Sequence, residues 1–339
     1  MSKKLIAALA ILALAASNAP AAAASSGAIV IKIGSIAPER SPWGKALEKV
    51  ARDWERISNG TVQVKIYPGG IAGSEQDMIR KMRLGVLQGG VFTSMGLSKI
   101  EPSITVLNIP LLFHSAEEFG VVFDKMKPAF EKKIEEKGFK IVLWTHAGWV
   151  NFFTKEPVIY PEDLKKLKIS VTDNDPEIEQ VWKKMGYEVV PGDFKDLMVQ
   201  LQSGMVTAAY LPALLAGAGQ YFAVVPHMLS MTLAPLVGSL ILSDKAWASI
   251  PADLHLPFIA AIAEASRGLL EETQGLEADA VKMMKENGLI VHDAPPAALE
   301  KWRQAAAEGV RDLIGPRFSK EMYDQIVGYL QEFRKARGK

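Results

Sequence analysis

Residues 29–70 read IVIKIGSIAPERSPWGKALEKVARDWERISNGTVQVKIYPGG and contain a complete strand, helix and strand. The apolar, β-branched run from Ile29 to Ile33 predicts a buried strand. Ser41 and Pro42 supply a capping hydroxyl and a first-turn proline, so they predict the start of a helix. Strict alternation of apolar and polar residues from Val62 to Ile66 predicts the second strand. Such a unit indicates an α/β fold with a parallel sheet.

A second α/β unit begins near Gly148, after a strand expected at 139–144. Further strands are expected at 151–154, 168–172, 187–190 and 206–211, and the chain beyond Pro251 is predicted to be almost wholly helical. No low-complexity linker separates the two units, so the chain is expected to cross between them more than once and to leave a shared cleft. The expected lobe I comprises 27–148 plus about 237–275, and lobe II comprises 149–236 plus about 276–339.

The first 26 residues have the pattern of a secretory signal peptide. Lys3 and Lys4 precede an unbroken apolar run from Leu5 to Ala16, and small residues follow from Ala21 to Ala24. The apolar run is too short to span the roughly 30 Å of a bilayer core as a helix. Residues 1–26 are therefore predicted to be cleaved, which places the mature protein in the periplasm.

Composition and motifs argue against several classes of function. The 339 residues contain 39 Lys and Arg against 38 Asp and Glu, so a nucleic-acid partner is not expected. There is no cysteine, and the five histidines show no metal-ligand spacing. The common nucleophile, zinc-protease and phosphate-loop motifs are missing. We therefore expect neither an enzyme nor a protein with a metal or cofactor.

The order and spacing of several short motifs carry a family resemblance over nearly the whole mature chain. They include Ser41-Pro42-Trp43-Gly44-Lys45-Ala46, Ile109-Pro110-Leu111-Leu112-Phe113, Pro161-Glu162-Asp163-Leu164-Lys165 and Leu201-Gln202-Ser203-Gly204. In these motifs the sequence resembles the DctP-type solute-binding proteins of tripartite ATP-independent periplasmic (TRAP) transporters. The resemblance implies a two-domain Venus-flytrap fold with a long hinge-spanning C-terminal helix. It also implies a binding protein that hands a small solute to membrane permease subunits.

The chain departs from this family where most members clamp a carboxylate. The arginine of the family's Lys-Ile-Arg-Val-Pro-like strand is replaced by Ser170, and a second family arginine falls at Val150. The ligand-binding asparagine of the family and its acidic neighbour become Leu211 and Tyr210. Another frequent asparagine aligns with Ile36. A cleft without cations would exclude the usual organic acid, because burying an uncompensated carboxylate costs several kcal/mol.

These departures predict a pocket for an apolar or amphipathic solute, with only Glu75 and Thr93 left to hydrogen-bond it. The predicted ligand-binding residues are Ile36, Trp43, Glu75, Phe92, Thr93, Trp149, Val150, Ser170, Tyr210, Leu211 and Leu233. The pattern also looks similar to a divergent branch of the family that is associated with a periplasmic tetratricopeptide-repeat partner, which is analogy alone.

Three alternatives stay open at this stage. The chain could be a conventional organic-acid binder that uses a cation from an unaligned position, such as Lys168 or Arg80. It could be an exported scaffold that binds only proteins. The apolar residues could also simply close the lobes on each other, with Leu211 as ordinary core.

Overall fold

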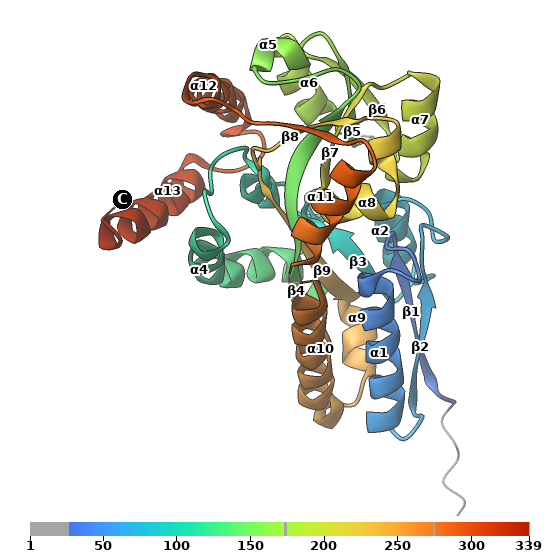
Figure 1. The fold of residues 1–339 in the computed structure, drawn as a ribbon. Helices are drawn as coiled ribbons and strands as arrows, with labels where there is room; N and C mark the ends of the chain where they lie inside the picture. The colour runs from blue at the N-terminus through green and yellow to red at the C-terminus, as the bar shows by residue number, and fades with distance from the viewer. Residues whose placement is uncertain (1–26, 173–174, 274, 339) are drawn as a thin grey trace, which may run out of the picture.

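The computed structural model describes residues 27–172, 175–273 and 275–338, whose strands form one 10-stranded mixed sheet (Figure 1). The predicted signal peptide lies outside these residues. The strand order is β2-β1-β3-β9-β4-β7-β5-β6, with β8 on β4 and β10 on β8. The strands are β1 (Ile29–Ser35), β2 (Val62–Tyr67), β3 (Gly89–Thr93), β4 (Phe139–Thr154), β5 (Lys168–Thr172), β6 (Glu188–Gly192), β7 (Ala208–Pro212), β8 (His227–Leu229), β9 (Pro235–Ser243) and β10 (Ile290–His292).

Helices cover both faces of this sheet. They are α1 (Pro42–Ile57), α2 (Glu75–Arg83), α3 (Ser94–Leu97), α4 (Ala116–Glu135), α5 (Pro161–Leu164), α6 (Pro176–Lys184), α7 (Leu197–Ser203), α8 (Ala213–Ala218), α9 (Asp244–Ser249), α10 (Ala252–Thr273), α11 (Leu276–Glu286), α12 (Pro296–Leu313) and α13 (Lys320–Ala336), with 3₁₀ turns η1 (Pro102–Asn108), η2 (Phe194–Asp196) and η3 (Tyr221–Ala223). No helix within the described residues combines the length and the apolar character needed to cross a bilayer.

The strand–helix–strand unit at the N-terminus is confirmed. β1 pairs in parallel with β2 from Ile29 to Gly34, and the Ser41 hydroxyl caps α1 by accepting from the backbone N–H of Gly44 at 3.2 Å. The apolar face of α1 packs against α10, where the Trp54 and Phe258 rings stack 4.2 Å apart. Burial of this face fixes the two helices on one side of the sheet.

Two long strands connect the two halves of the sheet. The expected strands at 139–144 and 151–154 are one 16-residue strand, β4, which changes partners along its length. It pairs with β9 as far as Trp149 and with β7 from Val150 onward. The sequence around Gly148 was interpreted as a break between two strands, but the structure has a β-bulge there. The register shifts between His146 and Trp149, and Gly148 has a φ of +102°. β4 and β9 therefore hold the first half (β2-β1-β3-β9) and the second half (β7-β5-β6) together.

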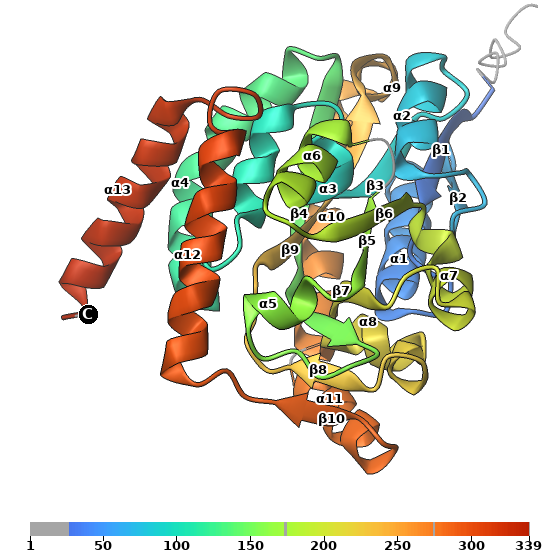
Figure 2. The same ribbon diagram turned by 90° about the horizontal axis from the view of Figure 1, so that it is seen from above.

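The C-terminal helices pack on both halves, as Figures 1 and 2 show. The expected hinge-spanning helix is present as two successive helices, α10 on α1 and α11 on α8. α12 contacts α5 and α6 of the second half. α13 packs on α4 of the first half, through Ile326 and Leu330, although its range falls in the segment expected for lobe II. The lobe boundaries themselves stay predictions.

Candidate functional site

Two adjacent cavities lie between the halves of the sheet. Cavity 1 has a volume of about 180 Å³ and is enclosed by η1, α6, α12 and the ends of β4 and β7. Cavity 2 has a volume of about 350 Å³ and is enclosed by the loops after β1, β2 and β6, the start of α2 and the end of β7. Cavities at strand ends between two α/β units are where such folds usually bind ligands.

Most of the wall of cavity 1 is apolar. Its lining residues are Met95, Ser98, Thr105, Asn108, Ile109, Pro110, Val150, Phe152, Asp175, Ile178, Val181, Trp182, Met185, Tyr210, Leu233, Ala234, Leu236, Ala305, Ala306, Gly309, Val310, Leu313 and Arg317. Asp175 and Arg317 are the charged members of this described set. The cavity thus offers hydrophobic surface with one compensated pair of charges.

Cavity 2 is more polar, and its charges also balance. Its described lining contains two cations, Lys99 and Lys195, and two carboxylates, Glu75 and Asp193. Its other members include Ile36, Pro38, Gly69, Gly70, Gly73, Ser74, Gln76, Thr93, Met95, Gly96, Val150, Phe194, Tyr210, Leu211, Pro212, Leu215, Tyr221 and Leu236. When all of these carboxylates are ionised, neither cavity therefore carries an excess of positive charge within the described residues.

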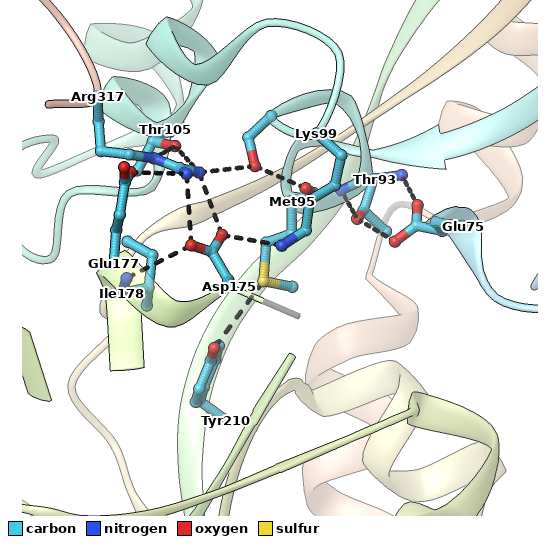
Figure 3. Close-up of polar contacts among 12 residues, drawn as sticks. Glu75, Thr93, Met95, Lys99, Thr105, Asp175, Glu177, Ile178, Tyr210 and Arg317 are labelled. Atoms are coloured by element: carbon cyan, nitrogen blue, oxygen red, sulfur yellow. Dashed lines mark hydrogen bonds and ion pairs between the residues drawn. The ribbon is translucent and has the colours of Figure 1, made fainter. Parts of the chain in front are cut away.

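An ion pair between Arg317 and Asp175 anchors the wall of cavity 1 (Figure 3). The Arg317 side chain is only 8% exposed, and its Nη1 and Nη2 donate to Asp175 at 3.3 and 3.1 Å. Nη1 also donates to Glu177, and Nε and Nη2 donate to the Thr105 hydroxyl at 3.2 and 3.0 Å. With this many fixed acceptors, the Arg317 guanidinium is held in place by side chains of the protein itself.

Lys99 lies beside the same carboxylate. Its Nζ is 3.1 Å from Asp175 Oδ2, and both side chains are largely buried. Asp175 also caps α6 by accepting from the backbone N–H of Ile178 at 3.4 Å. The expectation of a cleft without cations was wrong: Lys99, Lys195 and Arg317 line it, but each is paired with a carboxylate of the chain itself.

Glu75 is the most perturbed acid of the site. Its carboxylate accepts hydrogen bonds from the backbone N–H of Thr93 at 2.5 Å and from the Thr93 hydroxyl at 3.0 Å. Removal from bulk water outweighs these bonds and the nearby Lys99, and it raises the pKa of Glu75 to about 7. The carboxyl can therefore exchange a proton near neutral pH.

Tyr210 stands where the two cavities meet. It lines both, together with Met95, Val150 and Leu236. Its hydroxyl points at Met95 Sδ, 3.9 Å away (Figure 3). The rings of Phe152 and Tyr210 meet edge to face. Burial, followed by the charge of Asp175, raises the pKa of the Tyr210 hydroxyl to about 12, so it stays protonated.

The structure brings seven of the predicted ligand-binding residues to the cavities. Val150 and Tyr210 line both cavities and Leu233 lines cavity 1. The residues that line cavity 2 alone are Ile36, Glu75, Thr93 and Leu211. Leu211 is also only 4% exposed and belongs to a buried cluster of the second half. Its side chain is therefore part of the core and of the wall of cavity 2.

The other four predicted residues line neither cavity. Phe92 is 1% exposed, because alternation along β3 turns its ring into the core of the first half. The bulge in β4 turns Trp149 toward that core as well. Trp43 lies at the start of α1, away from both cavity walls. Ser170 is half-buried in β5, between the core residues Ile169 and Val171.

Sequence reasoning missed Arg317 and Lys99. Arg317 follows α12 and lies 142 positions from Asp175, so no local pattern signals the pair. The two cations that were considered, Lys168 and Arg80, are exposed and lie beside Glu188 and Asp77 instead. Asp175 directly precedes Pro176, the first residue of α6, and caps that helix. The described residues contain no group of three acidic or histidine side chains able to hold a metal ion.

Comparison with known proteins assigns the family. The model of the family "Bacterial extracellular solute-binding protein, family 7" (DctP) matches residues 33–315. A solute-binding protein of Chromohalobacter salexigens is 28% identical over 176 residues, which are 51% of this chain and about half (52%) of that relative. A solute-binding protein of Roseobacter denitrificans is 26% identical over 77% of this chain and 82% of its own length.

A solved structure has the same fold. It is the sugar acid binding protein DctPAm of Advenella mimigardefordensis in complex with galactonate, with a TM-score of 0.83, 20% identity and coverage of 90% of this chain and 99% of that one. The two-domain α/β fold is thereby confirmed, and the family consists of binding proteins rather than enzymes. This chain belongs to the DctP family of bacterial extracellular solute-binding proteins, the solute-binding proteins of TRAP transporters.

Proposed function

We propose that this chain is the solute-binding subunit of a TRAP transporter and that it captures a small apolar or amphipathic solute in the two cavities between its halves. The observation that carries the proposal is the wall of the cavities: apolar side chains dominate it, and its charged groups compensate one another. Closure over the solute would then present it to the membrane permease subunits.

The charge balance favours an apolar solute over an anion. Arg317 already pairs with Asp175 and Glu177, and Lys99 pairs with Asp175, so a ligand carboxylate would have to displace one of these partners. By the family resemblance described above, Ser170 and Val150 stand at positions where most members have arginines. Apolar surface, in contrast, contributes roughly 25 cal/mol for each Å² removed from water.

Localisation and partners follow from the same assignment. Members of an extracellular solute-binding family are exported, which supports a periplasmic location, and residues 1–26 have the pattern of the segment that would direct it. The tetratricopeptide-repeat partner stays a prediction of the resemblance.

Extraction of the natural ligand tests this function. The full chain is purified from a periplasmic fraction without added ligand, extracted with organic solvent and analysed by mass spectrometry. We expect an apolar or amphipathic compound near one copy per protein. Val150→Arg, which puts a cation into the shared wall, should lose that compound, whereas Val199→Arg, at an exposed position of α7, should keep it. Recovery of an empty protein would favour a protein-binding scaffold.

A second candidate is an organic-acid binder. Lys99 and Lys195 line cavity 2, and the structurally similar DctPAm holds galactonate. Calorimetry with galactonate and succinate separates the two: affinity for either acid that disappears in Lys195→Met would support this candidate and contradict the apolar one. Lys245→Met on α9, which lines neither cavity, is the matched control.

A further inference from the structure

Cavities 1 and 2 share the lining residues Met95, Val150, Tyr210 and Leu236. Of these, Tyr210 and Met95 meet, hydroxyl to sulfur, at 3.9 Å. A thioether is a weak acceptor, so the hydrogen bond from the Tyr210 hydroxyl to Met95 Sδ is a weak one. The two cavities are therefore neighbouring compartments of one site, and a slender molecule could reach from one into the other.

Helix α6 supplies independent evidence that cavity 1 is built to be filled. Ile178, Val181 and Trp182 give this helix an apolar face, yet none of its nine residues, all of which the structure describes, is buried. Amphipathic helices normally bury such a face in a core. Here Ile178 and Val181 pack only in part against the core of the first half and Trp182 only in part against that of the second, and the remaining surface of the face borders cavity 1, opposite the small residues of α12.

The facing surface of α12 keeps the space open. Ala305, Ala306 and Gly309 present little side-chain volume to the cavity, and a Cβ at Gly309 would lie only 3.0 Å from Met185 Sδ. The resulting volume of about 180 Å³ exceeds the roughly 150 Å³ of an engineered apolar cavity that binds benzene. Cavity 1 therefore has room for an apolar group of at least that size.

We infer that cavity 1 is a tail compartment: it receives the hydrocarbon tail of an amphipathic solute, which passes between Tyr210 and Met95, while the polar head stays in cavity 2 among Glu75, Thr93 and Lys99. This inference rests on the proposed function and adds to it the shape of the solute. Tail length, rather than head-group charge, is then the property that the site selects.

A series of 1-alkanols from butanol to decanol, titrated by calorimetry into the full mature chain, tests the inference. Each added methylene should raise the affinity of the wild-type protein about fourfold until the compartment is full. Ala306→Phe, which fills cavity 1, should stop that rise at a shorter chain. Ala307→Phe, on the exposed side of α12, should behave as wild type. If Ala306→Phe does not fold, Val181→Phe narrows the same cavity from α6.

The outcomes separate this inference from the proposed function. Equal gains with chain length in wild type and Ala306→Phe would overturn the tail compartment even if an apolar compound is extracted from the native protein. An affinity that does not depend on chain length would overturn it as well. Failure of every alcohol to bind, together with an extracted organic acid, would overturn both.

Discussion

Lys99 Nζ lies 3.1 Å from Asp175 Oδ2 and so joins the turn after α3, in the first half, to the first turn of α6, in the second half. Because both side chains are largely buried, this pair is shielded from solvent and salt more than a surface pair would be. Arg317 binds the same carboxylate from the segment that follows α12. Three distant parts of the chain thus meet at one acid beside the candidate site.

Removing the guanidinium should destabilise this junction. Arg317→Met leaves Thr105 and Ser98 without their donor and Asp175 with Lys99 alone, so we expect a loss of about 3 kcal/mol in the free energy of unfolding, measured with urea. Arg311→Met, at an exposed position of α12, should change stability by less than about 0.5 kcal/mol. Equal stability of the two variants would show that the buried pair contributes nothing.

Glu75 should make stability depend on pH. Its folded-state pKa, about 7, is raised above its ordinary value of 4.5, so folding favours the protonated carboxyl. This contribution is fully present below about pH 4.5 and is lost as the pH rises through about 7, with a size of up to about 3 kcal/mol. Glu75→Gln should therefore gain stability relative to wild type over that window. Urea unfolding at several pH values measures this difference in the free energy of unfolding, with the exposed Glu55→Gln as control. If the free energies of wild type and Glu75→Gln changed with pH in parallel, the raised pKa of Glu75 would be contradicted.

Gly148 should not tolerate a side chain. Its φ of +102° disfavours other residues, and a Cβ would lie 2.4 Å from Glu277 Oε1, which accepts from the backbone N–H of Trp149 at 3.2 Å. We expect Gly148→Ala to cost about 2 kcal/mol or more. Gly268→Ala in α10, where the added Cβ meets nothing within 4 Å, should be neutral or stabilising. Adding Glu277→Ala should restore part of the loss in Gly148→Ala; no restoration would exclude the steric explanation.

Leu211→Asn should reduce both stability and binding, because this side chain is core and cavity wall at once. Burying an amide in place of a leucine should cost about 3 kcal/mol. Leu215→Asn, also in the wall of cavity 2 but only half-buried, should cost less while weakening apolar affinity to a similar degree. Thermal melts and titration with octanol measure both effects. A melting temperature of Leu211→Asn equal to that of wild type would show that Leu211 is not part of the core.

Local sequence patterns predicted the helices and strands, because alternation and helix capping involve residues that are close together in the sequence. Alternation marked β2, and the capping serine with its proline marked α1. The bulge at Gly148 was read as a break, because a glycine between apolar runs can signal either. Only the pairing of β4 with β9, a partner from much later in the chain, makes it one strand.

The family resemblance located part of the site, although Ser170, at the position of a family arginine, lines neither cavity. Val150 and Tyr210 line both cavities at aligned positions. Phe92 was expected at the wall although the strand's alternation turns it inward. Arg317 and Lys99 lie at the site because they form ion pairs with Asp175. These are tertiary contacts, and no spacing of residues in the sequence predicts them.

The position of β9 between β3 and β4 has a consequence for the order in which the chain can fold. β3 and β4 are made early, but neither acquires its shared neighbour until the chain has been made as far as Ser243. Pairings over such long sequence separations form slowly. A chain that emerges N-terminus first therefore cannot complete its first half ahead of its second, and a fragment ending before Pro235 would lack the central strand that both require.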